Sequence, residues 1–242
     1  MKRTLKILKW ILISLISIVL LMVIGLTFYT LDASKPLDEM YETIETLDRT
    51  DIILTEDFDT YKLSVSNPIA NIIIIPGGKV YTESYFYLAY QLACYGYQVY
   101  LTKALFHLAI LNPFGPSKYI SNDLPNIIIG HSLGGTVGSM IAGSSNQIDH
   151  LILLASYASN KINDSDVLLI TAEHDLVLNQ TNFNQSLSNY NTYVHTNIAG
   201  GNHAGFGWYG VQQGDGINSI TIKEQQDLTL DIIINYLTEN LS

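Results

Sequence analysis

The stretch Asn126-Ile127-Ile128-Ile129-Gly130-His131-Ser132-Leu133-Gly134-Gly135 joins an apolar run of β-branched residues to a glycine-rich turn. The isoleucine run predicts a strand that is buried on both faces. The small residues from Gly134 to about Ala142 predict a helix. A G-x-S-x-G sequence in this strand–turn–helix context predicts a tight, strained turn. That turn lifts the Ser132 hydroxyl clear of the sheet, at a helix N-terminus whose dipole favours a developing oxyanion.

Strands and helices are expected to alternate on both sides of this motif. The predicted strands are residues 53–54, 61–66, 72–75, 98–102, 150–155, 167–171 and 192–198. The predicted helices are residues 82–95, 179–189 and 222–237. Repeated β-then-α order predicts an α/β fold, with a mostly parallel central sheet and helices on both faces.

Three stretches of this region carry a resemblance to a known superfamily. They are Ile75-Pro76-Gly77-Gly78-Lys79-Val80, Gly130-His131-Ser132-Leu133-Gly134-Gly135 and Gly200-Gly201-Asn202-His203-Ala204. Together they resemble the alpha/beta-hydrolase superfamily, and within it the small, lidless branch that includes dienelactone-hydrolase-like proteins. The resemblance covers about residues 50–240. It implies the alpha/beta-hydrolase fold and a general hydrolase activity, but it does not imply a substrate.

The resemblance also implies a Ser-Asp-His catalytic triad, because the acid and then the base follow the nucleophile in this superfamily. The acid is expected just beyond a strand, where Ala172-Glu173-His174-Asp175 stands. The superfamily pattern favours Asp175 over Glu173. His203, after the last predicted strand, is the expected base for the nucleophile Ser132. The remaining histidines are expected to be structural.

Two backbone N–H groups are expected to form an oxyanion hole. One belongs to Leu133, the residue after the nucleophile, and the other to the loop that begins at Pro76. Gly78 is the expected donor of that loop and Lys79 is the alternative. Many relatives begin this loop with His where this chain has Pro76, so the position of the second donor stays open.

No cofactor or metal ion is expected, because the chain lacks an H-E-x-x-H motif, a phosphate loop and a dinucleotide fingerprint.

Cys94 is the single cysteine, and its place in a predicted helix suggests a small core residue. Residues 213–216 are expected to form a turn and not a cation loop. The chain has 22 acidic and 12 basic residues, and this net negative charge argues against a nucleic-acid partner.

Residues 1–30 differ from the rest of the chain. Four basic residues precede Trp10–Phe28, a run of 19 uncharged and mostly apolar residues that is close to the length needed to span a bilayer. A single-pass, uncleaved anchor in the cell membrane is favoured over a cleaved signal peptide, whose apolar region would be shorter. The positive-inside rule then predicts a cytoplasmic N-terminus and an extracytoplasmic catalytic domain.

The predicted organisation is therefore a basic tip and anchor (1–30), an acidic stalk or short amphipathic helix (31–50) and a catalytic domain (51–242). The expected function is hydrolysis of a small-molecule or cell-envelope carboxylic ester, thioester or lactone. The alternatives are an acyltransferase with the same triad, or a non-catalytic binding module on a hydrolase scaffold.

The segment Ser156–Asp166 joins two predicted strands and, with 11 residues, is too short for a lid. An open site that prefers short acyl groups is therefore expected. The aromatic residues Phe206, Trp208 and Tyr209 either wall the substrate site or pack their loop onto the core.

Overall fold

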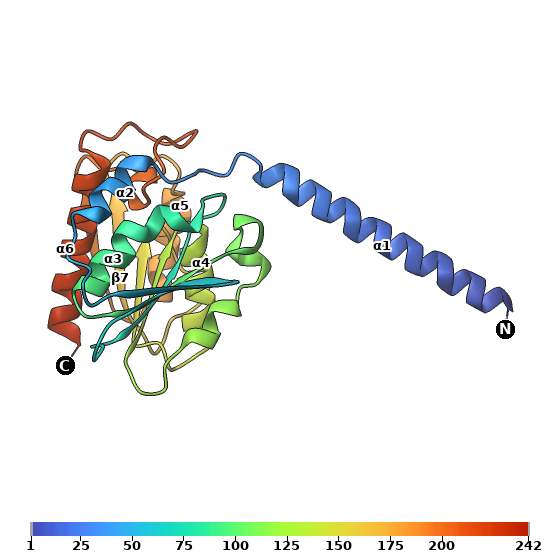
Figure 1. Cartoon of the computed structure of the whole chain (residues 1–242), viewed down its shortest axis with the longest axis horizontal. Helices are drawn as coiled ribbons and strands as arrows, with labels where there is room; N and C mark the ends of the chain where they lie inside the picture. The colour runs from blue at the N-terminus through green and yellow to red at the C-terminus, as the bar shows by residue number, and fades with distance from the viewer. Residues whose placement is uncertain (1, 242) are drawn as a thin grey trace. The chain divides into compact units, whose positions relative to one another are not determined.

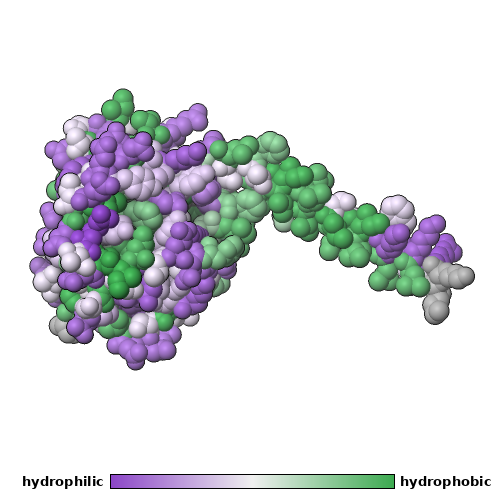
Figure 2. Space-filling model, in the orientation of Figure 1, coloured by the Kyte–Doolittle hydropathy of each residue, from purple (hydrophilic) through white to green (hydrophobic). Residues whose placement is uncertain are grey.

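The computed structural model describes residues 2–241, which form two compact units that divide after Ala33. The first unit is mainly the helix α1 (Lys2–Thr30). Its residues Arg3–Thr30 are long and apolar enough to cross a membrane. Figure 2 shows hydrophobic residues along most of α1, with hydrophilic residues near its N-terminal end. The proposed anchor run Trp10–Phe28 thus lies within one continuous helix.

The second unit, from Ser34 onward, contains an eight-stranded sheet. Its order is β1-β2-β4-β3-β5-β6-β7-β8. The β1–β2 and β2–β4 pairs are antiparallel, and the remaining pairs are parallel. The strands are β1 (Ile53–Asp57), β2 (Thr60–Ser64), β3 (Asn71–Ile75), β4 (Gln98–Thr102), β5 (Asn126–His131), β6 (His150–Leu154), β7 (Asp166–Ala172) and β8 (Tyr193–Ile198). The mostly parallel α/β sheet predicted from the sequence is confirmed.

Helices cover both faces of this sheet (Figure 1). The α-helices of the second unit are α2 (Asp38–Glu45), α3 (Phe86–Cys94), α4 (Leu133–Ala142), α5 (Gln180–Ser186) and α6 (Ile222–Asn240). The 3₁₀ turns are η1 (Thr82–Tyr85), η2 (Leu105–His107), η3 (Ala109–Leu111), η4 (Gly115–Tyr119), η5 (Leu187–Asn189) and η6 (Ala204–Phe206). Three of these turns, η2 to η4, lie in the long connection between β4 and β5.

The sheet separates two hydrophobic cores, because successive side chains of a strand point to opposite faces. In β3, Ile72 and Ile74 belong to the core under α2, α3 and α6. Ile73 and Ile75 belong to the core under α4 and α5. All four are essentially inaccessible to solvent. The uninterrupted isoleucine run therefore reflects a strand that is covered on both sides.

Several local predictions need correction. The helix expected over residues 82–95 begins as the 3₁₀ turn η1 and becomes α-helical only at Phe86. Cys94 is exposed at the last residue of α3, so the prediction that it is a core residue is wrong. Of the two alternatives for residues 31–50, the short helix is present as α2, and Met40 and Ile44 of this helix are buried in the core of the second unit, so the segment is not a free stalk.

The parallel strands place four connections at one edge of the sheet. The carboxyl ends of β3, β5, β7 and β8 lie at this edge, since these strands run in the same direction. In open α/β sheets, this edge is where ligands bind. The loops after these four strands contain the residues that the sequence singled out.

Candidate active site

Ser132 occupies a strained turn between β5 and α4. Its backbone has φ 52° and ψ −121°, a conformation that side chains rarely adopt. The turn has no room for side chains at its flanking glycines. A Cβ on Gly130 would collide with the backbone of Gly135, and a Cβ on Gly134 would collide with the carbonyl of Ile75. The sequence G-x-S-x-G thus permits the close contact of strand, turn and helix.

The turn is fixed from both sides by hydrogen bonds. The Ser132 N–H donates to the carbonyl of Leu154 at 3.0 Å, and the Ser156 hydroxyl donates to the carbonyl of Ser132 at 2.7 Å. Ser132 itself remains partly exposed. Leu133 is the first residue of α4, so its N–H has no intrahelical acceptor and is available to a ligand.

Asp175 and His203 form a buried pair at the ends of β7 and β8. The His203 Nδ1 lies 2.9 Å from Asp175 Oδ2, and the two side chains are 2% and 0% exposed. The other oxygen, Asp175 Oδ1, accepts the N–H groups of Val177 and Leu178, both at 2.8 Å. With the Nδ1 proton donated to Asp175, the Nε2 of His203 is left to accept a proton.

Glu173, the alternative acid, has a different environment. Its side chain is 56% exposed, and Oε2 accepts the N–H of Gly200 at 2.8 Å. Glu173 therefore helps to hold the glycine loop before His203, whereas Asp175 contacts the imidazole itself. This geometry favours Asp175 as the acid.

Asp215 is a site residue that the sequence prediction missed. Its carboxylate accepts the N–H of His203 at 3.3 Å and the N–H of Ala204 at 2.8 Å. It also accepts the N–H of Leu176 at 3.4 Å, in the loop that follows Asp175. Asp215 therefore joins the acid loop to the base loop. A lone Asp between two glycines was the only signal in the sequence, and it predicted no more than a turn.

His131 lies beneath the turn and belongs to a hydrogen-bond chain. Gly77 donates its N–H to the Tyr85 hydroxyl at 3.0 Å, and Tyr85 Oη lies 2.7 Å from His131 Nδ1. Burial, reinforced by nearby His203, holds the pKa of His131 well below its usual value. The imidazole is therefore neutral, and its Nδ1 shares one hydrogen bond with the Tyr85 hydroxyl. This chain connects the loop after β3 to the turn that holds Ser132.

We expect Tyr85→Phe to lower the free energy of unfolding by about 1–3 kcal/mol, because it leaves the buried Gly77 N–H and His131 Nδ1 without their shared partner. Denaturant titration measures the change. Tyr97→Phe is the matched control, since Tyr97 is also buried but no hydrogen bond between described residues involves its hydroxyl. Equal effects of the two variants would contradict a special role for the Tyr85 chain.

The loop after β3 offers one free donor in the expected place. The Gly77 N–H is used by Tyr85, and the Lys79 N–H donates to the carbonyl of His107 at 2.8 Å. The Gly78 N–H has no acceptor within residues 2–241. A Cβ on Gly78 would lie 2.9 Å from Leu133 Cδ2, so the two expected oxyanion donors belong to segments in contact. This arrangement favours Gly78 over Lys79.

The remaining candidate features lie elsewhere. Phe206, Trp208 and Tyr209 are all at most 5% exposed and pack into a core, so they do not wall an open site. The connection between β6 and β7 contains no helix and forms no lid. No group of three or more His, Cys, Asp or Glu side chains in the described part of the chain could hold a metal ion.

Comparisons with known proteins identify the family and the fold. The alpha/beta hydrolase family model matches residues 71–227. A search of curated proteins gives no match. The chain is similar to the solved structure of a predicted CIB-like hydrolase from Thermoplasma acidophilum, with 17% identity over 76% of this chain and 99% of that one, and a TM-score of 0.55.

Two further solved structures share the fold. A dienelactone hydrolase from Anabaena variabilis is 11% identical over 76% of this chain and 98% of its own, with a TM-score of 0.58. The mouse alpha/beta hydrolase domain-containing protein 10 is 12% identical over 78% of this chain and 98% of its own, with a TM-score of 0.52. Because the family model covers more than half of the sequence, the chain belongs to the alpha/beta hydrolase family.

Proposed function

We propose that the protein is a membrane-anchored serine hydrolase that cleaves a carboxylic ester, thioester or lactone. The observation that carries this proposal is the buried Asp175–His203 pair at the same sheet edge as Ser132 in its strained turn. A buried carboxylate that orients an imidazole is the arrangement that activates a serine hydroxyl. Membership of the alpha/beta hydrolase family supports the same reaction class.

The proposed reaction has two acyl-transfer steps. His203 Nε2 takes the proton of Ser132, and the serine oxygen attacks the carbonyl carbon of the substrate. The N–H groups of Leu133 and Gly78 stabilise the negative oxygen of the tetrahedral intermediate. His203 then gives its proton to the leaving alcohol or thiol, and water releases the acyl group from Ser132 by the same route in reverse. Asp175 keeps the imidazole in the required tautomer and stabilises its charged form.

The chemistry of this site needs only the side chains named above, so we propose no cofactor. Product analysis tests the reaction class. The full chain, held in lipid nanodiscs, should convert an aryl ester into free acid and free phenol in equal amounts. If added alcohols or glycans capture most of the acyl group, the same triad serves an acyltransferase. If neither product forms with any ester, thioester or lactone tested, the proposed activity is wrong.

We further propose that Trp10–Phe28 anchors the protein in the cell membrane, with the catalytic domain on the extracytoplasmic side. The support is the one helix within residues 2–241 that is long and apolar enough to span a membrane, the basic residues that precede the apolar run and the acidic residues that follow it. The substrate would then be a small molecule or an ester of the cell envelope. The net charge of −10 gives no support to a nucleic-acid partner.

Protease added to intact cells should therefore digest the catalytic domain and leave a tag at the N-terminus protected inside. The measurement is immunoblotting of both ends of the chain, with a cytoplasmic protein as the control for cell integrity. Protection of the domain until lysis would reverse the proposed topology. A soluble product that starts near Ala33 or Ser34 would show instead that the N-terminal segment is cleaved.

A further inference from the structure

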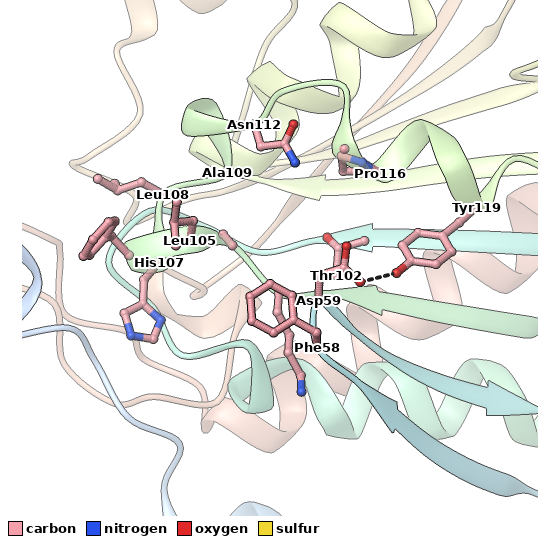
Figure 3. Close-up of a pocket in the computed structure, with 14 residues that line it drawn as sticks. Phe58, Asp59, Thr102, Leu105, His107, Leu108, Ala109, Asn112, Pro116 and Tyr119 are labelled. Atoms are coloured by element: carbon pink, nitrogen blue, oxygen red, sulfur yellow. Dashed lines mark hydrogen bonds between the residues drawn. The ribbon is translucent and has the colours of Figure 1, made fainter. Parts of the chain in front are cut away.

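A cavity of about 510 Å³ lies between the β1–β2 turn and the long connection from β4 to β5. We call it the β4–β5 pocket, and its lining comprises residues 58–59, 102–109, 112, 115–116 and 119. Figure 3 shows the labelled side chains from both segments around it. Its volume is within the range of about 300–1,000 Å³ that is typical of small-molecule sites.

Most of the surface that this pocket offers is hydrocarbon. Its apolar lining includes Phe58, Ala104, Leu105, Phe106, Leu108 and Pro116. The charged groups at its border are already paired. Asp59 accepts hydrogen bonds from Lys118 and Tyr119, and Lys103 binds Glu56. Because these charges are satisfied within the protein, an uncharged, apolar ligand fits the pocket best.

The one lining histidine adds no charge. Burial lowers the pKa of His107, so its imidazole is neutral at pH 7. The ring also packs against Tyr81, with 4.3 Å between ring centroids.

His107 and its neighbour Phe106 both have φ 52°, a strained conformation for residues with side chains. The rest of the fold therefore holds this wall of the pocket in an unfavourable backbone geometry.

The pocket adjoins the proposed oxyanion donors. Leu108 Cδ2 lies 3.6 Å from the position of a Cβ on Gly78, and the carbonyl of His107 accepts the N–H of Lys79. Ala109, on the same wall, packs in one core with Val137 of α4. One wall of the pocket is therefore in contact with the loop that would hold the carbonyl oxygen of a substrate.

The strand order decides which part of an ester would enter this pocket. The pocket lies at the carboxyl end of β4, whereas His203 follows β8, and β3, β5, β6 and β7 stand between these two strands. The leaving alcohol receives its proton from His203 in the proposed reaction, so it must lie on the β8 side. The acyl chain extends from the same carbonyl carbon toward the opposite side.

We propose that the β4–β5 pocket binds the aliphatic acyl chain of the substrate, which makes the enzyme selective for medium-length acyl groups. This inference rests on the proposed function and replaces the short-acyl preference expected from the missing lid. Phe58 and Leu105 line the pocket and are 96% and 60% exposed, so its mouth presents apolar surface to an entering chain.

A series of nitrophenyl esters with the full chain in lipid nanodiscs tests the inference. The ratio of kcat/KM for the hexanoate to that for the acetate should be about tenfold or more. Each methylene that is fully transferred from water into the pocket can raise kcat/KM by about fourfold. If the pocket selects medium-length chains, the ratio of kcat/KM for the palmitate to that for the acetate should be lower than the hexanoate-to-acetate ratio. Lengthening the alcohol instead of the acyl group should give no such rise.

Phe58→Asp places a charge at the mouth of the pocket and should reduce the hexanoate-to-acetate ratio about fivefold or more. A general loss of activity lowers kcat/KM for both esters by the same factor and therefore leaves this ratio unchanged. Ile53→Asp is the matched control, because Ile53 is 66% exposed on the same β-hairpin but does not line the pocket. A flat acyl series, an optimum that follows the alcohol, or equal ratios in the two variants would each overturn the inference.

A second measurement separates this inference from the proposed function. The Ser132→Ala chain is incubated with an octanoic acid that carries a photoreactive diazirine, and the adducts are mapped by peptide sequencing. Adducts on Phe58 or on residues 104–109 support the pocket even if no ester is hydrolysed. Ester hydrolysis without adducts on these residues would leave the proposed function standing and refute the pocket as the acyl site.

Discussion

Ser132→Ala is expected to lower kcat for a soluble aryl ester by about 10⁵-fold or more, since it removes the atom that forms the acyl-enzyme bond. The backbone of the turn is fixed by hydrogen bonds to Leu154 and Ser156 that do not involve the Ser132 hydroxyl, so the fold should remain intact. Steady-state hydrolysis and thermal unfolding measure the two effects. A variant with the activity of the wild type would exclude Ser132 as the nucleophile.

Ser139→Ala is the matched control for this substitution. It deletes the same atom from a buried residue of α4, the helix that begins directly after Ser132, and the hydroxyl of Ser139 donates only to the carbonyl of Thr136. Hydrolysis should stay close to that of the wild type. A loss as large as that of Ser132→Ala would indicate that damage to α4, and not loss of a nucleophile, explains both results.

Asp175→Asn is expected to lower kcat by about 10³–10⁴-fold, and His203→Ala by more than that. An amide at position 175 no longer selects the tautomer in which His203 Nε2 accepts a proton. The hydrogen bonds from Val177 and Leu178 can persist to the amide oxygen, so the loop should keep its conformation. The measurement is kcat for an aryl ester, with circular dichroism to verify the fold.

Glu173→Gln provides the comparison within the same loop. Its exposed side chain accepts one backbone hydrogen bond from Gly200, which the glutamine oxygen can also accept. We therefore expect an activity near that of the wild type. If Glu173→Gln is more harmful than Asp175→Asn, then the acid has been assigned to the wrong carboxylate.

Local sequence patterns predicted much of the fold and the candidate site. The isoleucine runs of β3 and β5 indicate buried strands, and the glycines around Ser132 indicate a tight turn. Asp175 and His203 followed from the superfamily order of triad residues, and the structure brings the two side chains into contact. These features depend on residues that are close in sequence or fixed in order.

Features built from distant segments were not predictable in this way. Asp215 contacts the backbone of His203 and Ala204 only because the loop before α6 folds back onto the loop that follows β8. Tyr85 and His131 are 46 residues apart and meet only when η1 packs beside β5. Cys94 lies within the predicted helix 82–95, but α3 ends at this residue and leaves it at the surface.

The β4–β5 pocket escaped prediction for a related reason. Its wall consists of 3₁₀ turns, which have no long period that a hydrophobic pattern can reveal. Phe106 and His107 adopt positive φ angles that their residue types do not suggest. The signal in the sequence was the length of the connection from Lys103 to Pro125, which contains no amphipathic helix.

The central claim is that Ser132 is a nucleophile activated by His203 and Asp175. The most direct measurement is reaction of the full-length protein with a fluorophosphonate, followed by mass-spectrometric mapping of the adduct. We predict a single adduct on Ser132, formed at a rate that falls sharply in the His203→Ala variant. An adduct on a different residue, or no adduct in a preparation that hydrolyses esters, would contradict the account.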